Sequence, residues 1–89
     1  MIHTNYLNIL TTLYNYGVLS AREISDQTGI DHTNIYDYLE RLCKVGWIVK
    51  EYGSLLDVNS TYKYRLSYEG TIFLNIYPVK EILDNQLEL

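Results

Sequence analysis

The sequence is poor in the residues that build cross-links, metal sites and membrane spans. Its 89 residues include one cysteine, Cys43, so an internal disulfide and an all-cysteine zinc site are excluded. The two histidines, His3 and His32, are far apart, and we expect no metal and no cofactor. No run approaches the roughly 18 consecutive apolar residues that a membrane helix needs, and no secretory leader is visible. We therefore expect an intracellular, cytoplasmic protein that has no membrane partner.

The sequence also lacks the motifs of catalysis. Its five glycines occur singly, at the expected ends of helices and strands, so no glycine-rich loop is available to bind a phosphate. No nucleophile motif has a histidine near it, and the carboxylates are scattered over capping and surface positions. We expect no enzymatic activity.

Positive charge is in deficit, with 7 Lys and Arg against 11 Asp and Glu and a net charge of −4. This balance is unusual for a nucleic-acid binder, whose affinity depends largely on neutralising phosphates. Residues 67–89, however, contain one basic and four acidic residues, so the remainder of the chain is close to neutral. The acidity therefore belongs mainly to the carboxyl-terminal segment.

What the chain does contain is enough apolar material for one folded domain. Hydrophobic residues make up 47% of it, and 89 residues are too few to bury two separate cores. Tyrosine accounts for 10 of the aromatic residues, beside a single Phe and a single Trp. Each tyrosine can bury a large ring while it keeps a polar tip for water or a partner.

Apolar spacing and capping residues predict two helices near the amino terminus. A helical stripe covers residues 4–16 and ends before Gly17. Ser20 and Glu23 have the spacing of a capping box, in which each side chain accepts from the backbone N–H of the other. This pattern predicts a short second helix that ends near Thr28.

A third helix is predicted directly after a tight turn at residues 28–31. Gly29 supplies the left-handed residue of the turn, and Asp31 is expected to cap the third helix, which Gly46 ends. Ser25 is small enough to let the two helices approach closely. The residues expected to be buried around the turn and along the third helix are Ile24, Ile30, Ile35, Leu39 and Leu42. Two short helices joined in this way are typical of a helix-turn-helix.

The second half of the chain predicts two strands and a further helix. Residues 47–52 are rich in β-formers, residues 62–66 alternate apolar with basic, and residues 53–61 form the loop between them. A helix follows over residues 67–77, with Ser67 as its cap. Pro78 either kinks this helix or begins a new one. The predicted fold class is α+β with a small antiparallel sheet.

Three fragments, LSAREISDQTGI, IYDYLERLCKVGWIV and YKYRLSYEG, follow one another in an order that resembles the winged helix-turn-helix transcription regulators of the MarR and ArsR kind. The resemblance covers roughly residues 5–77. It implies a three-helix core, a two-stranded β-wing and a carboxyl-terminal helix or helices. A tyrosine-rich chain of this size also resembles small regulators of archaea and their viruses.

The resemblance implies that the third helix enters the major groove of double-stranded DNA while the wing lies along the backbone or the minor groove. Carried over to this sequence, the base-reading residues are Thr33, Asn34, Tyr36, Asp37 and Arg41. Asn34 suits adenine and Arg41 suits guanine. The residues placed at phosphates are Arg22, His32, Lys44, Lys50, Lys63 and Arg65.

Some features depart from the family pattern and favour an alternative, a winged-helix module that binds another protein and no DNA. Asp37 and Glu40 lie on the helix face expected to meet DNA, and the wing tip at residues 53–59 contains no arginine. Arg41 could also pair with Asp37 one helical turn away. Cys43 is expected to pack as a small apolar residue, with a redox role or an intersubunit disulfide as the alternatives. A continuous positive strip would favour DNA, and a strip interrupted by acids would favour a protein partner.

The carboxyl-terminal segment carries an apolar stripe at helical spacing, formed by Ile72, Ile76, Val79, Leu83 and Leu87. Either this stripe closes the core of the monomer, or it binds a second copy. A winged-helix core needs little beyond residue 77, so we expect a domain at residues 1–77 and a dimerisation element at residues 78–89. A homodimer would place two recognition helices on a pseudo-palindromic operator.

Overall fold

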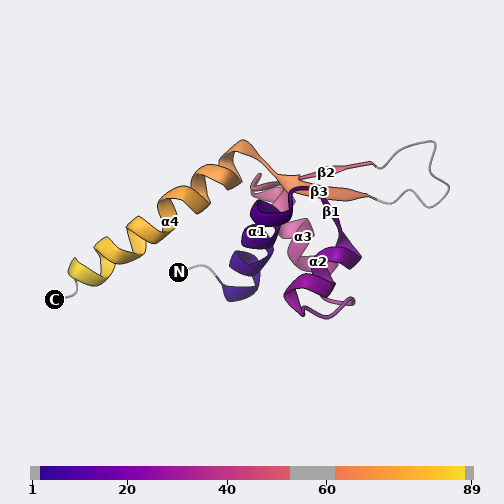
Figure 1. Ribbon diagram of the computed structural model, residues 1–89, viewed down its shortest axis with the longest axis horizontal. Helices are drawn as coiled ribbons and strands as arrows, with labels where there is room; N and C mark the ends of the chain where they lie inside the picture. Colours follow the sequence, from indigo (N-terminus) through magenta and orange to yellow (C-terminus); the bar gives the residue numbers. More distant parts are fainter. Residues whose placement is uncertain (1–2, 53–61, 88–89) are drawn as a thin grey trace.

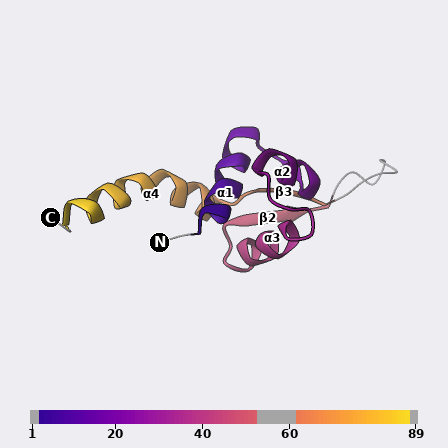
Figure 2. The ribbon, with the colours of Figure 1, turned by 90° about the horizontal axis from the view of Figure 1, so that it is seen from below.

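The computed structural model describes residues 3–52 and 62–87, with side chains as far as Tyr77. Its elements, in chain order, are α1 (Thr4–Tyr16), β1 (Leu19–Ser20), α2 (Ala21–Thr28), α3 (Ile35–Lys44), β2 (Ile48–Glu51), β3 (Lys63–Leu66) and α4 (Tyr68–Leu87). Three helices cluster beside a small sheet, and α4 extends away from this body on the side opposite the free ends of β2 and β3 (Figure 1). The view turned by 90° shows the same arrangement (Figure 2). The predicted α+β class is confirmed.

The predicted two-stranded wing is present as β2 paired with β3, and a short strand that the sequence did not predict, β1, extends it to a three-stranded antiparallel sheet in the order β1-β3-β2. The segment between α1 and α2 runs beside β3 and pairs Leu19 with Tyr64. Only two residues take part, too few to show the alternation from which a strand is recognised in a sequence. Burial of Leu19 in the core fixes the segment there. The other two strands are each slightly shorter than predicted.

The core lies where the three amino-terminal helices meet the sheet. The side chains that are at most 2% exposed come from three helices: Ile9, Leu10 and Leu13 of α1, Ile24 of α2, and Ile35, Leu39 and Leu42 of α3. These residues confirm the predicted helical stripes. Cys43 is partly buried and packs against this cluster, as predicted, and burial raises the pKa of its thiol.

The start of α2 is fixed by the predicted capping box. The Ser20 hydroxyl accepts from the Glu23 backbone N–H at 3.2 Å, and the Glu23 carboxylate accepts from the Ser20 N–H at 3.0 Å. These bonds, the bond from the Ser20 backbone above all, lower the pKa of Glu23. Two backbone donors that the helix itself cannot satisfy are thereby satisfied.

The start of α3 differs from the prediction, because Asp31 does not cap the helix directly. The helix begins at Ile35, and the Asp31 carboxylate accepts from the N–H and the hydroxyl of Thr33 at 2.9 and 3.0 Å. Aspartate readily binds the backbone two residues ahead, which forms a local turn in place of a helix cap. These hydrogen bonds lower the pKa of Asp31. His32, Thr33 and Asn34 therefore lie in a turn that leads into α3.

The position of α4 is set by a close backbone contact. Ser67 accepts from the Gly70 N–H at 3.0 Å, which confirms its predicted capping role. A Cβ atom on Gly70 would lie 2.1 Å from the carbonyl oxygen of Trp47, so only glycine lets the helix approach the β2 end. The helix continues through Pro78 to Leu87, so no new helix begins at the proline. In the described part of the chain, no helix combines the length and the apolar character that crossing a membrane requires.

Candidate nucleic-acid interface

The helix-turn-helix is held by a glycine and a buried hydroxyl. Gly29 has a φ of 76° in the left-handed region, and its N–H donates to the Ser25 carbonyl at 2.9 Å. The buried Ser25 hydroxyl donates to the carbonyl oxygen of Ile30. Ile35, with no exposed surface, fills the angle between the two helices, as predicted. The turn therefore gives α3 a fixed orientation on the body.

One face of α3 is exposed and polar. Its residues are Tyr36, Asp37, Glu40, Arg41 and Lys44. Of the predicted base-reading residues, Tyr36, Asp37 and Arg41 lie on this face, whereas Thr33 and Asn34 lie in the turn before it. Asn34 is exposed and its side chain does not cap the helix, so its amide is available to a partner. All five predicted base-reading residues are exposed, and the Thr33 hydroxyl donates to the Asp31 carboxylate at 3.0 Å.

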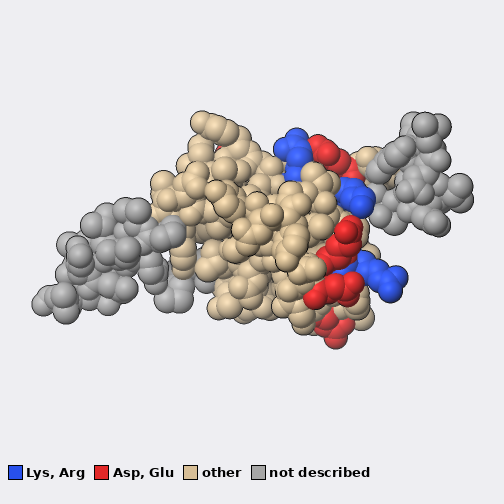
Figure 3. Space-filling view, viewed as in Figure 1, with Lys and Arg blue, Asp and Glu red and all other residues tan. Residues whose placement is uncertain are grey.

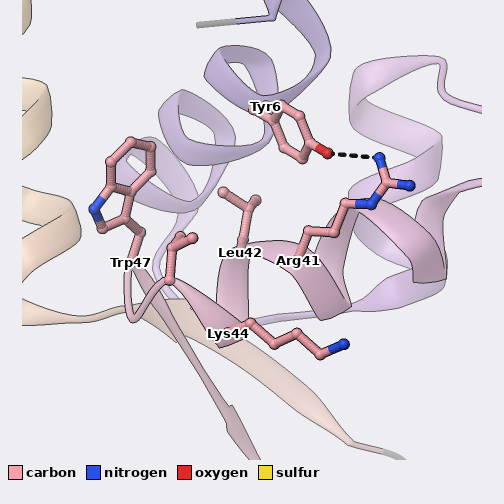
Figure 4. Close-up of a pocket in the computed structure, with 6 residues that line it drawn as sticks. Tyr6, Arg41, Leu42, Lys44 and Trp47 are labelled. Carbon is pink, nitrogen blue, oxygen red and sulfur yellow. Dashed lines mark hydrogen bonds between the residues drawn. The ribbon is translucent and has the colours of Figure 1, made fainter.

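Arg41 is directed to α1 and does not pair with Asp37. Its guanidinium donates to the Tyr6 hydroxyl at 3.1 Å, and this bond raises the pKa of Arg41 (Figure 4). Tyr6 is itself held edge-on against Tyr38, with 5.0 Å between the ring centroids. In Figure 4, Lys44 points away from this contact. Arg41 therefore lies on the α1 flank of the exposed face, above an apolar cleft of about 440 Å³.

Most predicted phosphate contacts are paired with acids. Ion pairs join Lys44 to Glu40 at 3.5 Å, Lys63 to Glu23 at 3.3 Å and Arg65 to Glu51 at 2.5 Å, and His32 Nε2 lies 3.4 Å from a carboxylate oxygen of Asp26. On the face seen in Figure 3, red and blue side chains alternate at the end of the body near the free ends of β2 and β3. The strip of basic residues is therefore interrupted by carboxylates. The wing tip at residues 53–59 lies outside the described residues.

The basic residues of the two wing strands are divided between the two faces of the sheet. Alternation along paired strands places Lys50 and Tyr64, which are directly opposite, on one face. Lys63 and Arg65 lie on the other face, where Arg65 binds Glu51. The predicted phosphate contacts therefore do not form one surface.

The Lys50 face contains a groove that the sequence did not predict as a site. It has a volume of about 520 Å³ and is lined by Ser20, Ala21, Arg22, Tyr36, Lys50, Tyr52, Tyr62 and Tyr64. Three of these tyrosines, Tyr52, Tyr62 and Tyr64, were not among the predicted site residues. The signal was present in the sequence, because Lys50 and Tyr52, like Tyr62 and Tyr64, are two residues apart and so share a face of their strand.

The carboxyl-terminal stripe is exposed where its side chains are described. Ile72 is 40% and Ile76 is 55% exposed, whereas Phe73 and Leu74 pack against the core. Phe73 stacks on Trp47 with 4.2 Å between the ring centroids. The first part of the stripe therefore does not close the monomer's core. The side chains of Val79, Leu83 and Leu87 lie outside the described residues.

A family model described as the sugar-specific transcriptional regulator TrmB matches residues 5–68, which include all of α1 but its first residue, the helix-turn-helix and the three strands β1, β2 and β3. The chain belongs to the TrmB family. The predicted resemblance to winged-helix transcription regulators is thereby confirmed, and the family is one of regulators and not of enzymes. Among curated protein sequences, no match to this TrmB-family chain was found.

Several solved structures, some of them described as transcriptional regulators, share the fold of this TrmB-family protein. The regulator PcaV from Streptomyces coelicolor, in complex with its natural ligand, is 23% identical with a TM-score of 0.78 over 99% of this chain and 61% of its own. YusO from Bacillus subtilis is 20% identical, with a TM-score of 0.77 over 98% of this chain and 62% of its own. A mutant MarR from E. coli, complexed with operator DNA, is 17% identical, with a TM-score of 0.70 over 80% and 49%. The chain thus spans less than two thirds of their length.

Proposed function

We propose that this protein is a sequence-specific, double-stranded DNA-binding transcription regulator that acts as a homodimer on a pseudo-palindromic operator. The observation that carries the proposal is the family match over residues 5–68. These residues contain a helix-turn-helix whose second helix, α3, has an exposed polar face. A structure of similar fold, the MarR mutant, was solved with operator DNA. In helix-turn-helix proteins this helix lies in the major groove.

The proposed contacts on DNA fall into two groups. Base edges are read by Thr33, Asn34, Tyr36, Asp37 and Arg41. Phosphates are bound by Arg22, His32, Lys44, Lys50, Lys63 and Arg65. The ion pairs of Lys44, Lys63 and Arg65 with carboxylates reduce what these three contribute, because each pair must be opened before a phosphate takes its place.

The proposed dimer uses the apolar stripe of α4, namely Ile72, Ile76, Val79, Leu83 and Leu87. The exposure of Ile72 and Ile76 and the extension of α4 away from the body support this assignment. Exposed apolar faces of this kind usually mark partner sites. Two copies related by a two-fold axis would meet half-sites about one DNA turn, roughly 34 Å, apart.

The test is a duplex selected from a random library by the wild-type protein, with affinities followed by fluorescence anisotropy from 50 to 200 mM salt. Arg41→Ala should weaken preference at one base position by about 1–3 kcal/mol. Arg22→Ala, its matched control among the phosphate contacts, should weaken all sequences alike and reduce the salt dependence. Equal discrimination by wild type and Arg41→Ala would refute the base-reading assignment.

A second candidate function is binding of another protein without DNA. It is favoured by the carboxylates that neutralise the basic residues of the predicted interface, Glu23, Glu40 and Glu51. A fold alone does not decide between these functions. If the wild-type protein selects no duplex even at 50 mM salt, this second function replaces the first.

A further inference from the structure

We infer that the groove between α2, α3 and the wing strands binds a phosphodiester group of the DNA backbone, with tyrosine hydroxyls as well as basic side chains as its ligands. The inference rests on the proposed DNA-binding function and identifies where the backbone is held. Its residues are Arg22, Tyr36, Lys50, Tyr52, Tyr62 and Tyr64, which we call the tyrosine groove.

The electrostatics of the tyrosine groove differ from those of the rest of the interface. Among the described residues that line it there is no carboxylate, and two of them, Arg22 and Lys50, are basic. Within residues 3–52 and 62–77, neither forms an ion pair, whereas Lys44, Lys63 and Arg65 each do. An anion therefore meets two unneutralised positive charges only here among the predicted phosphate contacts. This contrast explains how an acidic chain can bind a polyanion.

The geometry of the aromatic residues prepares the groove for a phosphate. The Lys50 ammonium lies 4.1 Å from the centroid of the Tyr62 ring, and Tyr52 meets that ring edge-on at 5.1 Å. The cation–π contact holds the ammonium beside the groove without removing its charge. Phenol hydroxyls donate hydrogen bonds to phosphate oxygens, and such contacts position a protein on the duplex without reading its sequence. Tyr52 and Tyr62 line the groove and are exposed, so a phosphate can reach them.

The position of the groove favours a duplex over a small anion as the source of the phosphate. Tyr36 belongs both to the groove and to the exposed face of α3. When α3 lies in a major groove, the strand at the edge of that groove passes directly beside it. The same side chain then adjoins a base edge and the neighbouring phosphate. Tyr36 is therefore assigned to the backbone as well as to the bases.

Salt dependence separates the tyrosine groove from the paired basic residues. Lys50→Gln should lower the salt slope of binding to the selected duplex by about one, because one phosphate contact is lost. Lys44→Gln, which removes a lysine already paired with Glu40, is the matched control and should change the slope by much less. Equal slopes for the two variants would overturn the inference.

Conservative changes test the hydroxyls without loss of packing. Tyr52→Phe and Tyr62→Phe keep the rings, and the second keeps the aromatic face for Lys50, so the fold should be unaffected. Each should weaken binding by about two- to tenfold, the effect of one hydrogen bond. The wild-type protein should bind more weakly to a duplex in which one neutral methylphosphonate replaces the phosphate in the groove. Lys50→Gln should then cause no further loss of affinity for that duplex.

If the losses from Lys50→Gln and from the methylphosphonate add in full at every phosphate position, the assignment is contradicted.

A further arm separates the failure of this inference from the failure of the proposed function. If the wild-type protein binds no duplex, DNA binding is refuted, and inorganic phosphate is titrated while the tyrosine ring signals are followed by NMR. Saturable shifts of Tyr52 and Tyr62 that Lys50→Gln abolishes would support a phosphate site that serves a free anion. Unshifted rings would overturn the site itself.

Discussion

At the scale of single residues, Gly70 leaves no room for a side chain. A Cβ atom at position 70 would lie 2.1 Å from the Trp47 carbonyl oxygen, so Gly70→Ala must push α4 away from the start of β2. We expect this variant to lose about 1–3 kcal/mol of the free energy of unfolding, as overpacked sites do. Urea denaturation followed by circular dichroism measures the loss. Asn75→Ala, an exposed change on the same helix, is the control and should leave the midpoint almost unchanged.

The residue scale also shows which contacts a sequence reveals. The capping box of Ser20 and Glu23 was predictable because both partners lie within one helical turn. The bond between Arg41 and Tyr6 joins residues 35 positions apart, and no local pattern encodes it. The prediction therefore offered Asp37, a neighbour in sequence, as the alternative partner. The identity and spacing of neighbouring residues determine the local hydrogen bonds of the capping box. The hydrogen bond between Arg41 and Tyr6 depends instead on how α1 packs against α3.

At the scale of elements, the start of α2 should make stability depend on pH. The pKa of Glu23 is lowered from 4.5 by the Ser20 backbone N–H, so the ionised carboxylate stabilises the folded state. This contribution is fully present above the unfolded pKa and is lost as the pH falls through the lower folded pKa. Glu23→Gln should therefore be less stable than wild type at pH 7, with the difference shrinking below pH 4.5.

The measurement is urea denaturation of both proteins between pH 7 and pH 3. Gln27→Ala, an exposed change on the same helix that removes no titrating group, provides the control and should differ from wild type by a constant amount. A stability gap between wild type and Glu23→Gln that stays constant down to pH 3 would show that the carboxylate charge adds nothing to the cap.

Elements were predicted unevenly, for physical reasons. The helices have enough residues for an apolar stripe to emerge, and Ile9, Leu10 and Leu13 are buried as their spacing predicted. Strand β1 has two residues and is created by its pairing with β3, so it has no pattern of its own. The two-residue spacing of the lysine and tyrosines on each wing strand was visible in the sequence, but the tyrosine groove was missed because it forms only where these strands meet two helices.

At the scale of the whole molecule, we expect the acidic residues of the proposed interface to limit its affinity for DNA. Glu40 lies on the exposed face of α3 and neutralises Lys44 at 3.5 Å. Glu40→Gln removes repulsion of phosphates and releases Lys44, so the selected duplex should bind more tightly, with a salt slope steeper by up to about one. Glu69→Gln, an exposed acid at the start of α4, is the control. Unchanged affinity in Glu40→Gln would place this part of α3 away from the duplex.

We expect the oligomeric state to depend on the face of α4 that the body leaves uncovered. Ile72 and Ile76 are exposed on a helix of 20 residues whose core side is already occupied by Phe73 and Leu74. If a second copy covers this face, Ile76→Asp places a charge in an apolar interface and should convert a dimer to a monomer. Light scattering coupled to size-exclusion chromatography gives the mass directly.

The matched control is Asn75→Asp, which adds the same charge one position away. It should remain dimeric, and circular dichroism should show both variants folded, since neither residue belongs to the buried core. Binding to a single half-site should survive in Ile76→Asp, while affinity for the two-half-site duplex should fall because the two recognition helices are no longer linked. A wild-type protein that is monomeric at every concentration and still selects a palindromic duplex would require the DNA, and not α4, to bring the two copies together.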